Sequence, residues 1–329
     1  MKIDIGNPEA LGKYLSARGM LGAGDSIVSA TVAGEGNMNY TIRVTTKTGS
    51  LIVKQANPYV QKYPQLAAPQ SRALVEAKFY LSVQDEPALH KMMPGLLDVD
   101  EQNFILMLED LGDARDMSYL YQDGNCLSEN ELGSLVQYLN ALHCGFKKPG
   151  EDELMSNRAL RLLNYDHIFK YPLLEDNGFD LNGVQPGLQE LSMKFKKNES
   201  LKEKAFAMGE QYLADGNTLL HGDFYPGSWL NASGAIKIID PEFSFYGPAE
   251  FDLAVMKAHL LLADHPATLV GSLIEGYEAP ANFNHELFDG FTGMEIIRRL
   301  IGLAQLPLSL SLAKKEKLLN KAAGLLKAA

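Results

Sequence analysis

Residues 219–230 (LLHGDFYPGSWL) and 236–242 (IKIIDPE) carry the clearest structural signals in the sequence. In the first, a polar turn lies between apolar pairs, which is typical of a loop between buried elements. The second reads as a mostly buried strand that ends in two carboxylates. Ser233-Gly234 predicts a hairpin turn between them. Such a hairpin would bring Asp223 and Asp240, which are 240 − 223 = 17 positions apart, to one end of a sheet.

Carboxylates that meet at strand ends indicate a divalent cation and a charged substrate. Magnesium takes oxygen ligands and usually shares them with phosphate groups. The alternative for each residue taken alone is structural: Asp223 would cap a turn, and Asp240 would only end a strand. The whole pattern favours the cation site.

His221-Gly222-Asp223, followed by Asp240, resembles the catalytic loop and metal strand of the protein-kinase-like small-molecule kinases, which include the aminoglycoside and choline kinases. The run at residues 240–248 (DPEFSFYGP) more narrowly resembles the methylthioribose kinases. Gly227-Ser228 also resembles the methylthioribose kinases, whereas most other relatives in the group have an asparagine at this place. The resemblance implies an α+β, two-lobed fold. A nucleotide-binding lobe with an antiparallel sheet would span residues 1–109, and a mostly helical lobe with the catalytic loop and acceptor site would span residues 110–329.

The resemblance also implies roles for individual residues. Asp223 would orient the acceptor hydroxyl and accept its proton, which makes it the expected catalytic residue. Asp240 and Glu242 would hold Mg²⁺, and Ser228 would lie on the cofactor side of the site. Asp252 would brace the catalytic loop through its backbone; its alternative is an ordinary first-turn aspartate favoured by the helix dipole.

The N-terminal third predicts an antiparallel meander with strands at residues 27–33, 40–46 and 50–55. The first turn, residues 34–39 (GEGNMN), could cradle phosphate, because glycines let backbone N–H groups approach an anion. An ordinary hairpin is the alternative. The resemblance favours nucleotide contacts here, made by Gly34, Gly36 and Asn37.

Lys54 nearly closes the third of these strands, where it is either an edge residue or a phosphate ligand in a cleft. A helix is expected over residues 71–81, and by resemblance its Glu76 pairs with Lys54, placing the lysine on nucleotide phosphates. The strand at residues 104–108 should lead into a hinge between the lobes. There, Glu109 and Leu111 would contact the adenine.

Beyond the hinge the pattern is helical, with helices expected over residues 129–143, 188–213 and 314–329. His143 is expected to be a packed or capping residue. Arg298 and Arg299 lie in an apolar helical segment, residues 294–303, which resembles the twin-arginine segment at the sugar site of methylthioribose kinases. Adjacent helix positions point in different directions. We therefore expect one arginine to serve the acceptor and the other to serve packing or an ion pair.

Composition limits the partners. The 329 residues are 46% hydrophobic and carry a net charge of −11, which argues against nucleic acid or an anionic membrane. Cys126 and Cys144 give no disulfide framework and no metal-binding spacing. Free thiols, together with the lack of an apolar signal core or membrane span, predict a cytoplasmic protein. Whether the chain forms a homodimer stays open.

The predicted function is ATP- and Mg²⁺-dependent phosphoryl transfer to a hydroxyl of a sugar-like metabolite, with methylthioribose as one candidate. An aminoglycoside, choline or other amino-alcohol or sugar kinase is the first alternative. The reason is that residues 224–226 (FYP) stand where the closer family commonly has Leu-His-Thr. The second alternative is a catalytically silent nucleotide-binding protein.

Overall fold

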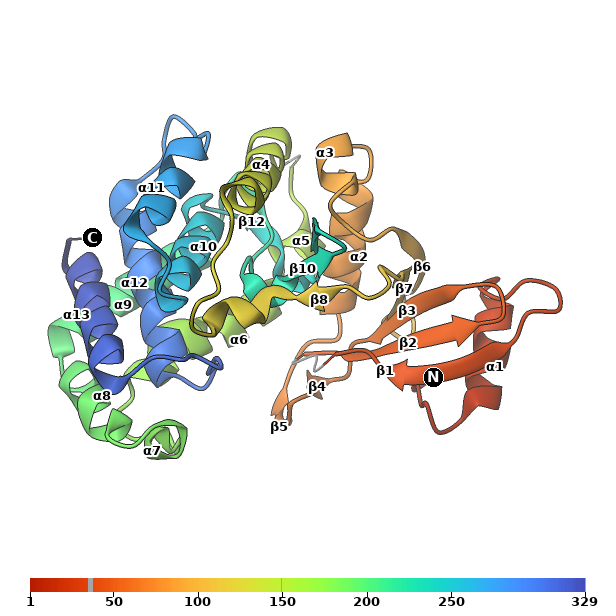
Figure 1. The fold of residues 1–329 in the computed structure, drawn as a ribbon, viewed down its shortest axis with the longest axis horizontal. Helices are drawn as coiled ribbons and strands as arrows, with labels where there is room; N and C mark the ends of the chain where they lie inside the picture. Colours follow the sequence, from red (N-terminus) through yellow and green to blue (C-terminus); the bar gives the residue numbers. More distant parts are fainter. Residues whose placement is uncertain (35–37, 149, 329) are drawn as a thin grey trace.

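The computed structural model describes residues 1–34, 38–148 and 150–328, and these fold into two lobes joined by one connection after strand β7 (Figure 1). Gly36 and Asn37, two of the predicted phosphate-loop residues, lie outside the described residues. The fold class expected from the sequence, with a sheet-containing N-terminal lobe and a mostly helical C-terminal lobe, is confirmed.

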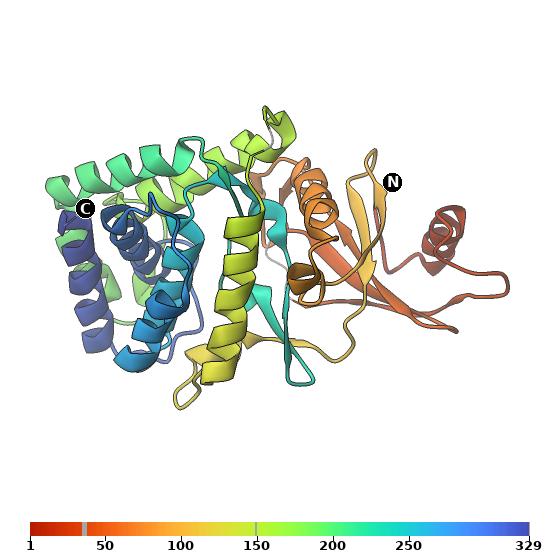
Figure 2. The ribbon, with the colours of Figure 1, turned by 90° about the horizontal axis from the view of Figure 1, so that it is seen from above.

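The N-terminal lobe is built on an antiparallel sheet of strand order β1-β2-β3-β7-β6. The predicted meander and the strand before the hinge are therefore confirmed. The two long helices of the lobe, α1 and α2, cover opposite faces of the sheet (Figures 1 and 2). The elements of this lobe are α1 (Pro8–Ala17), β1 (Ile27–Val32), β2 (Tyr40–Thr46), β3 (Ser50–Gln55), β4 (Tyr59–Val60), β5 (Tyr63–Ala67), α2 (Arg72–Val83), α3 (Pro87–His90), β6 (Leu96–Asp100) and β7 (Ile105–Glu109).

Strand β7 divides its side chains between two cores, because successive residues of a strand point to opposite faces. Ile105 and Met107 belong to the core under α1. Leu106 and Leu108 belong to the larger core that contains α2 and continues into the helical lobe. The sheet is therefore anchored to the helical lobe through one face only.

The C-terminal lobe packs helices around α12, which contacts α10, α13 and α9. Its elements are β8 (Arg115–Asp116), η1 (Met117–Tyr121), α4 (Glu129–Gly145), α5 (Glu153–Ser156), α6 (Arg158–Tyr165), η2 (Asp166–Lys170), η3 (Tyr171–Leu173), α7 (Leu181–Val184), α8 (Leu188–Lys196), α9 (Glu199–Leu213), β9 (Thr218–Leu220), η4 (Pro226–Ser228), β10 (Trp229–Ala232), β11 (Ala235–Ile238), η5 (Pro241–Phe243), β12 (Phe245–Gly247), α10 (Glu250–Leu262), α11 (Ala267–Gly276), α12 (His285–Ile301) and α13 (Leu312–Ala328).

The single helix expected over residues 188–213 is wrong, because the structure divides it into α8 and α9. Asn198 lies between them, and its side chain accepts a hydrogen bond from the N–H of Leu201. Asparagine is a favoured N-cap, since its carbonyl oxygen satisfies a free N–H of the first helical turn. The cap residue starts a new helix here.

The segment that carries the predicted site is a short hairpin enclosed by a second antiparallel strand pair. Strands β10 and β11 pair antiparallel, with Trp229 opposite Ile238. Their turn is the predicted one: Ser233 and Gly234 both have positive φ, 53° and 88°, as a two-residue hairpin turn of type I′ requires. Strand β9 pairs with β12. The loops after β9 and β11 are thereby brought to the boundary between the lobes.

Candidate active site

The loop after β9 is held by one buried carboxylate. Asp252, in the first turn of α10, accepts hydrogen bonds from the backbone N–H of His221 at 2.7 Å and of Gly222 at 2.9 Å. Gly222 has a φ of +84°, and a Cβ there would lie 2.1 Å from the carbonyl oxygen of Phe243. Only glycine fits this position. The predicted contact between Asp252 and the loop backbone is present.

Two buried histidines support this arrangement. Nε2 of His143 lies 3.2 Å from the Asp252 carboxylate, and its Nδ1 lies 2.7 Å from the hydroxyl of Tyr277. His221 donates from Nε2 to the carbonyl oxygen of Ile239 at 3.0 Å, and burial lowers its pKa. His143 is thus a packed residue, as expected, and it orients the carboxylate that holds the loop.

Lys54 lies between two carboxylates from different lobes. Its Nζ is 2.7 Å from Glu76 Oε2 and 2.6 Å from Asp240 Oδ1. Burial raises the pKa of Glu76, and the ammonium of Lys54 opposes this shift. Asp240 and Glu76 together hold the pKa of Lys54 above its usual range against burial, so the ammonium stays charged. The predicted ion pair between Lys54 and Glu76 is present.

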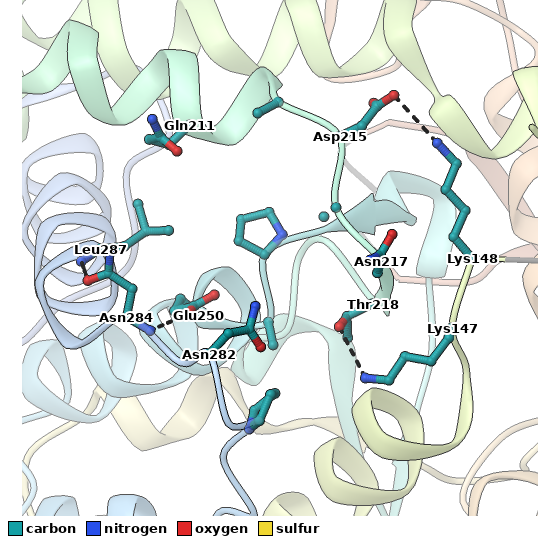
Figure 3. A pocket seen from close by; sticks show the side chains of 16 residues that line it. Lys147, Lys148, Gln211, Asp215, Asn217, Thr218, Glu250, Asn282, Asn284 and Leu287 are labelled. Atoms are coloured by element: carbon teal, nitrogen blue, oxygen red, sulfur yellow. Dashed lines mark hydrogen bonds and ion pairs between the residues drawn. The ribbon is translucent and has the colours of Figure 1, made fainter. Parts of the chain in front are cut away.

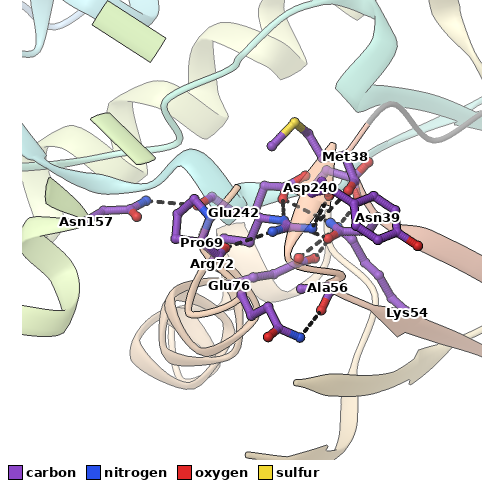
Figure 4. A network of polar contacts seen from close by, with 12 residues as sticks. Met38, Asn39, Lys54, Ala56, Pro69, Arg72, Glu76, Asn157, Asp240 and Glu242 are labelled. Atoms are coloured by element: carbon purple, nitrogen blue, oxygen red, sulfur yellow. Dashed lines mark hydrogen bonds and ion pairs between the residues drawn. The ribbon is translucent and has the colours of Figure 1, made fainter. Parts of the chain in front are cut away.

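A second network joins the lobes beside Lys54 (Figure 4). Asn39 Nδ2 donates to Glu242 Oε2 at 2.9 Å, and Arg72 Nε lies 3.2 Å from the same oxygen. Arg72 also donates to Asn39 Oδ1 at 2.9 Å and to the carbonyl oxygens of Met38 and Pro69. Arg72 was not among the predicted site residues. The signal in the sequence was its position: Arg72 is a charged residue in the first turn of the helix that carries Glu76.

The backbone at the start of the carboxylate segment is left-handed. Asp240 has φ 63° and ψ 48°, a conformation that is uncommon for residues other than glycine. Strained positions of this kind cluster at functional sites. Asn157 supports the next residues, because its side chain donates to the carbonyl oxygens of Glu242 and Ser244 at 2.9 and 3.1 Å.

On the other side of the loop after β9, Arg299 faces Asp223. The distance from Arg299 Nη2 to Asp223 Oδ1 is 3.5 Å, and the guanidinium lies over the ring of Tyr225, 4.7 Å from its centroid. Glu295 binds both arginines of the pair: Arg299 Nε at 2.6 Å and Arg298 Nη1 at 3.0 Å. Burial raises the pKa of Asp223, and the two arginines oppose that shift.

A cavity of about 60 Å³ between the lobes collects most of these groups. Its lining includes four of the predicted site residues from the C-terminal lobe and one from the N-terminal lobe, namely Asp223, Ser228, Asp240, Glu242 and Lys54. Ser228 Oγ donates to the carbonyl oxygen of Asp223 at 2.9 Å, so it also stabilises the turn. The sequence prediction that these segments form one site is consistent with this placement.

The predicted hinge residues lie apart from this lining. The N–H of Glu109 donates to the carbonyl oxygen of Gly95 at 2.8 Å. The turn that follows is anchored by Arg43, which donates to Asp110 Oδ1 at 2.9 Å. The roles of Glu109 and Leu111 in adenine binding therefore stay predictions, as does the role of Gly34, which has a φ of +70° at the start of the first turn.

The oxygen donors fit a hard cation in kind. Asp240 and Glu242 present carboxylates to one cavity, and the side chain of Asp240 is 43% exposed. Within the described residues no cluster of three or more histidine, cysteine, aspartate or glutamate side chains could hold a metal alone. Magnesium commonly takes one or two protein carboxylates and completes its shell with water and phosphate oxygens. The carboxylates of Asp240 and Glu242, in the same cavity as Lys54, fit that pattern.

A larger cavity, of about 740 Å³, lies in the helical lobe at the far end of the β9–β12 pair (Figure 3). Thr218 and Gly247 line it, whereas the catalytic loop leaves β9 at the opposite end. Lys147 Nζ already donates to the carbonyl oxygen of His143 and to Thr218 Oγ1, and Lys148 lies 3.5 Å from Asp215. Both lysines of this cavity thus have partners within the protein, and five of the predicted site residues line the smaller cavity, so we place the site there.

The family model described as "Phosphotransferase enzyme family" matches residues 29–291. The chain belongs to this phosphotransferase family. A methylthioribose kinase from Yersinia pestis is 28% identical over 263 residues, covering 76% of this chain and 63% of the relative. A methylthioribose kinase from Bacillus velezensis is 29% identical over 322 residues, covering 85% of this chain and 79% of the relative. The chain thus spans less than two thirds of the Yersinia protein.

Two solved structures share the fold of this chain. A choline kinase from Streptococcus pneumoniae superimposes with a TM-score of 0.56 at 15% identity, covering 98% of this chain and 99% of that one. A spectinomycin phosphotransferase, in complex with ADP and spectinomycin, gives 0.55 at 14% identity, covering 97% and 98%. These likenesses show a shared fold, and the predicted membership of a phosphotransferase family is confirmed by the family model.

The described part of the chain contains no helix that is long and apolar enough to cross a membrane. Within it, both Cys126 and Cys144 are free and exposed.

Proposed function

We propose that the protein is an ATP-dependent kinase that transfers the γ-phosphoryl group to a hydroxyl of a small, sugar-like metabolite. The observation that carries the proposal is the shared cavity, in which Asp223, Lys54, Asp240 and Glu242 meet from both lobes. In this division, residues 1–109 bind the nucleotide, and residues 110–329 hold the catalytic loop and the acceptor.

Asp223 is the proposed catalytic residue. The acceptor oxygen attacks the γ-phosphorus and forms a new P–O bond, the bond to the β-phosphate oxygen breaks, and ADP leaves. The hydroxyl proton passes to the Asp223 carboxylate. A carboxylate is a weak base toward an alcohol, but in a loose transition state the proton moves late and positioning matters most. The raised pKa of Asp223 makes its carboxylate a stronger base toward the hydroxyl proton.

Lys54 is the proposed ligand of the nucleotide phosphates. Its ammonium stays charged and is fixed from the side by Glu76, whose carboxylate lies 2.7 Å away. Asp240 and Glu242 would hold Mg²⁺, which when bound supplies positive charge against the phosphate oxygens. Gly34, Gly36, Asn37, Ser228, Glu109 and Leu111 complete the proposed nucleotide side of the site.

The acceptor side favours a neutral hydroxylated compound. Arg298 and Arg299 are both buried, and Arg299 faces Asp223. Such guanidinium groups donate several hydrogen bonds in a plane, which suits sugar hydroxyls, and they repel a cationic acceptor such as choline or an aminoglycoside. The methylthioribose kinases among the relatives make methylthioribose the first acceptor to test. Tyr225, in place of the family's usual histidine, is the feature that supports a different sugar.

The test is acceptor-dependent ADP release with ATP and Mg²⁺, using methylthioribose, free pentoses, choline and spectinomycin as acceptors. Mass spectrometry of the acceptor should show one added phosphoryl group. An Asp223→Asn preparation, purified in the same way, controls for contaminating kinases. Tight ATP binding with no acceptor-dependent turnover across the panel would favour the alternative of a silent nucleotide-binding protein.

A further inference from the structure

A buried polar chain runs from Tyr121 to the arginine that faces Asp223. The hydroxyl of Tyr121 lies 2.6 Å from His259 Nδ1, and His259 Nε2 lies 3.0 Å from Glu295 Oε1. The same Glu295 oxygen accepts from Arg299 Nε at 2.6 Å. These side chains come from η1, α10 and α12, and all of them are buried.

The chemistry allows one pattern of donors along this chain. The two arginines hold the pKa of Glu295 well below its usual range, so Glu295 is ionised and only accepts. His259 must therefore donate from Nε2. Burial lowers the pKa of His259 to about 4, so its imidazole is neutral near pH 7 and its Nδ1 accepts. The hydroxyl of Tyr121 is then the donor to Nδ1.

Glu295 separates the functions of the two arginines. Its Oε1 holds Arg299, and its Oε2 accepts from Arg298 Nη1 at 3.0 Å. With Nε fixed and the guanidinium plane resting on the ring of Tyr225, Arg299 turns Nη2 toward Asp223. Among the described residues this buried Nη2 has no hydrogen-bond partner, since Asp223 lies at 3.5 Å. This N–H group lies beside the Asp223 carboxylate and can donate a hydrogen bond to an oxygen atom of the bound substrate.

We propose that Glu295 is a positioning residue for the acceptor side of the site, and that Tyr121 and His259 orient its carboxylate. This inference rests on the proposed kinase function. Glu295 itself touches no reacting atom. It fixes the guanidinium that would contact the acceptor, in the way that outer-shell partners fix metal ligands.

Glu295→Gln is the primary test, because the amide keeps the size of the side chain and removes its charge. The acceptor kcat/KM should fall by about 10- to 100-fold, the range found when an orienting partner is removed. Nucleotide affinity, measured by calorimetry, should not change. Asp289→Asn is a matched control: Asp289 and Lys257 form a 2.7 Å ion pair between the same two helices, α12 and α10. The control should stay within about twofold of the wild type.

Tyr121→Phe tests the outer end of the chain and keeps the inference testable if Glu295→Gln fails to fold. Losing only one hydroxyl, it should give a smaller loss confined to acceptor kinetics. Unchanged acceptor kinetics in both variants would overturn the proposal. Equal losses of acceptor turnover and nucleotide affinity would overturn it too, since they indicate a purely structural role.

Two measurements separate this inference from the proposed function. Nitrogen-15 NMR of the wild-type protein near pH 7 should show His259 neutral and protonated at Nε2. A charged ring or an Nδ1–H tautomer overturns the donor pattern whatever the substrate. A crystal structure of Glu295→Gln should show Arg299 displaced from Asp223. An unchanged Arg299 overturns the positioning role, whereas a wild-type protein without kinase activity overturns the proposed function.

Discussion

Lys54 Nζ lies 2.6 Å from Asp240 Oδ1, although the two residues belong to different lobes and are 186 positions apart. The lysine is buried in the sheet of the N-terminal lobe, and the aspartate begins the carboxylate segment after β11. The proposed phosphate ligand and the proposed metal ligand therefore touch directly. A bound cation with phosphate oxygens would insert between an ammonium and a carboxylate that already balance each other's charge.

Asp223→Asn should keep nucleotide binding and lose phosphoryl transfer. The amide preserves shape but cannot accept the acceptor proton as the carboxylate does. General base catalysis contributes about 10²- to 10⁴-fold, so kcat should fall in that range. Steady-state ADP release and nucleotide calorimetry on the same preparation measure the two effects. Wild-type turnover by this variant would refute the role of Asp223.

Asp240→Ala should abolish the magnesium dependence of nucleotide binding, and Glu242→Ala should weaken it. Both carboxylates line the cavity that contains Lys54. Glu242→Ala also removes the acceptor for Asn39 and Arg72, so its effect on stability should be the larger one. Calorimetric titrations with and without Mg²⁺ test this. Unchanged metal dependence in both variants would place the metal elsewhere.

Arg299→Ala and Arg298→Ala should differ. Arg299 lies 3.5 Å from Asp223, so its removal should lower acceptor turnover while ATP affinity stays the same. Arg298 binds Glu295 at 3.0 Å, and its removal should act mainly on the free energy of unfolding. Acceptor kinetics and urea denaturation of both variants check the division. If neither variant alters acceptor kinetics, the sugar-site assignment loses its support.

Asp252→Asn should destabilise the protein and lower kcat together. The amide offers one acceptor oxygen where two backbone N–H groups now donate to the carboxylate. A buried N–H left without a partner costs about 1–3 kcal/mol. Denaturant unfolding measures the loss. Asp264→Asn is a suitable control, because its ion pair with Lys314 is exposed and such pairs contribute about 0–1 kcal/mol.

Lowering the pH should destabilise the folded protein through the buried hydrogen-bonded chain that joins Tyr121, His259 and Glu295. The pKa of His259 is lowered from 6.5 to about 4, so between these values the unfolded chain binds a proton that the folded protein does not. The free energy of unfolding should therefore decrease as the pH falls from about 6.5 to about 4, by an amount on the order of 3 kcal/mol. The depressed pKa of Glu295 acts in the same direction at still lower pH.

His259→Gln isolates this contribution, because glutamine does not titrate. The difference in unfolding free energy between the wild type and this variant should shrink as the pH falls from about 6.5 to 4. Urea denaturation at several pH values gives both curves. Parallel curves would show that His259 is not buried in its neutral form.

The parts of the site that sequence could predict are those encoded in short motifs, together with two contacts that the family resemblance implied: Lys54 with Glu76, and Asp252 with the loop backbone. The run from His221 to Asp223 and the run from Asp240 to Glu242 each place their side chains by local geometry, so a motif suffices. The contact between Asn39 and Glu242 joins residues 203 positions apart, and no local pattern encodes it. Arg72 was missed for the same reason: its partners lie in two other segments.

Glu295 was not predicted, although its relation to the two arginines is local in sequence. It lies in the same helical segment as the two arginines, three and four positions before them, which is the spacing at which helix side chains meet. The two arginines were among the predicted site residues, whereas Glu295, which binds both, was not. His259 and Tyr121 reach Glu295 only through packing between η1, α10 and α12. Asn198, which ends the long predicted helix, could have been recognised as an N-cap.

Arg72 has a consequence for how ligands communicate across the protein. Its guanidinium contacts the turn after β1 through Met38 and Asn39, and it contacts the carboxylate segment through Glu242 (Figure 4). A ligand that displaces either segment must change the interactions of the other. Binding to the two sides is then energetically coupled, and such coupling is reciprocal at equilibrium. A nucleotide that tightens cation binding by some factor should itself be bound more tightly, by the same factor, once the cation is present.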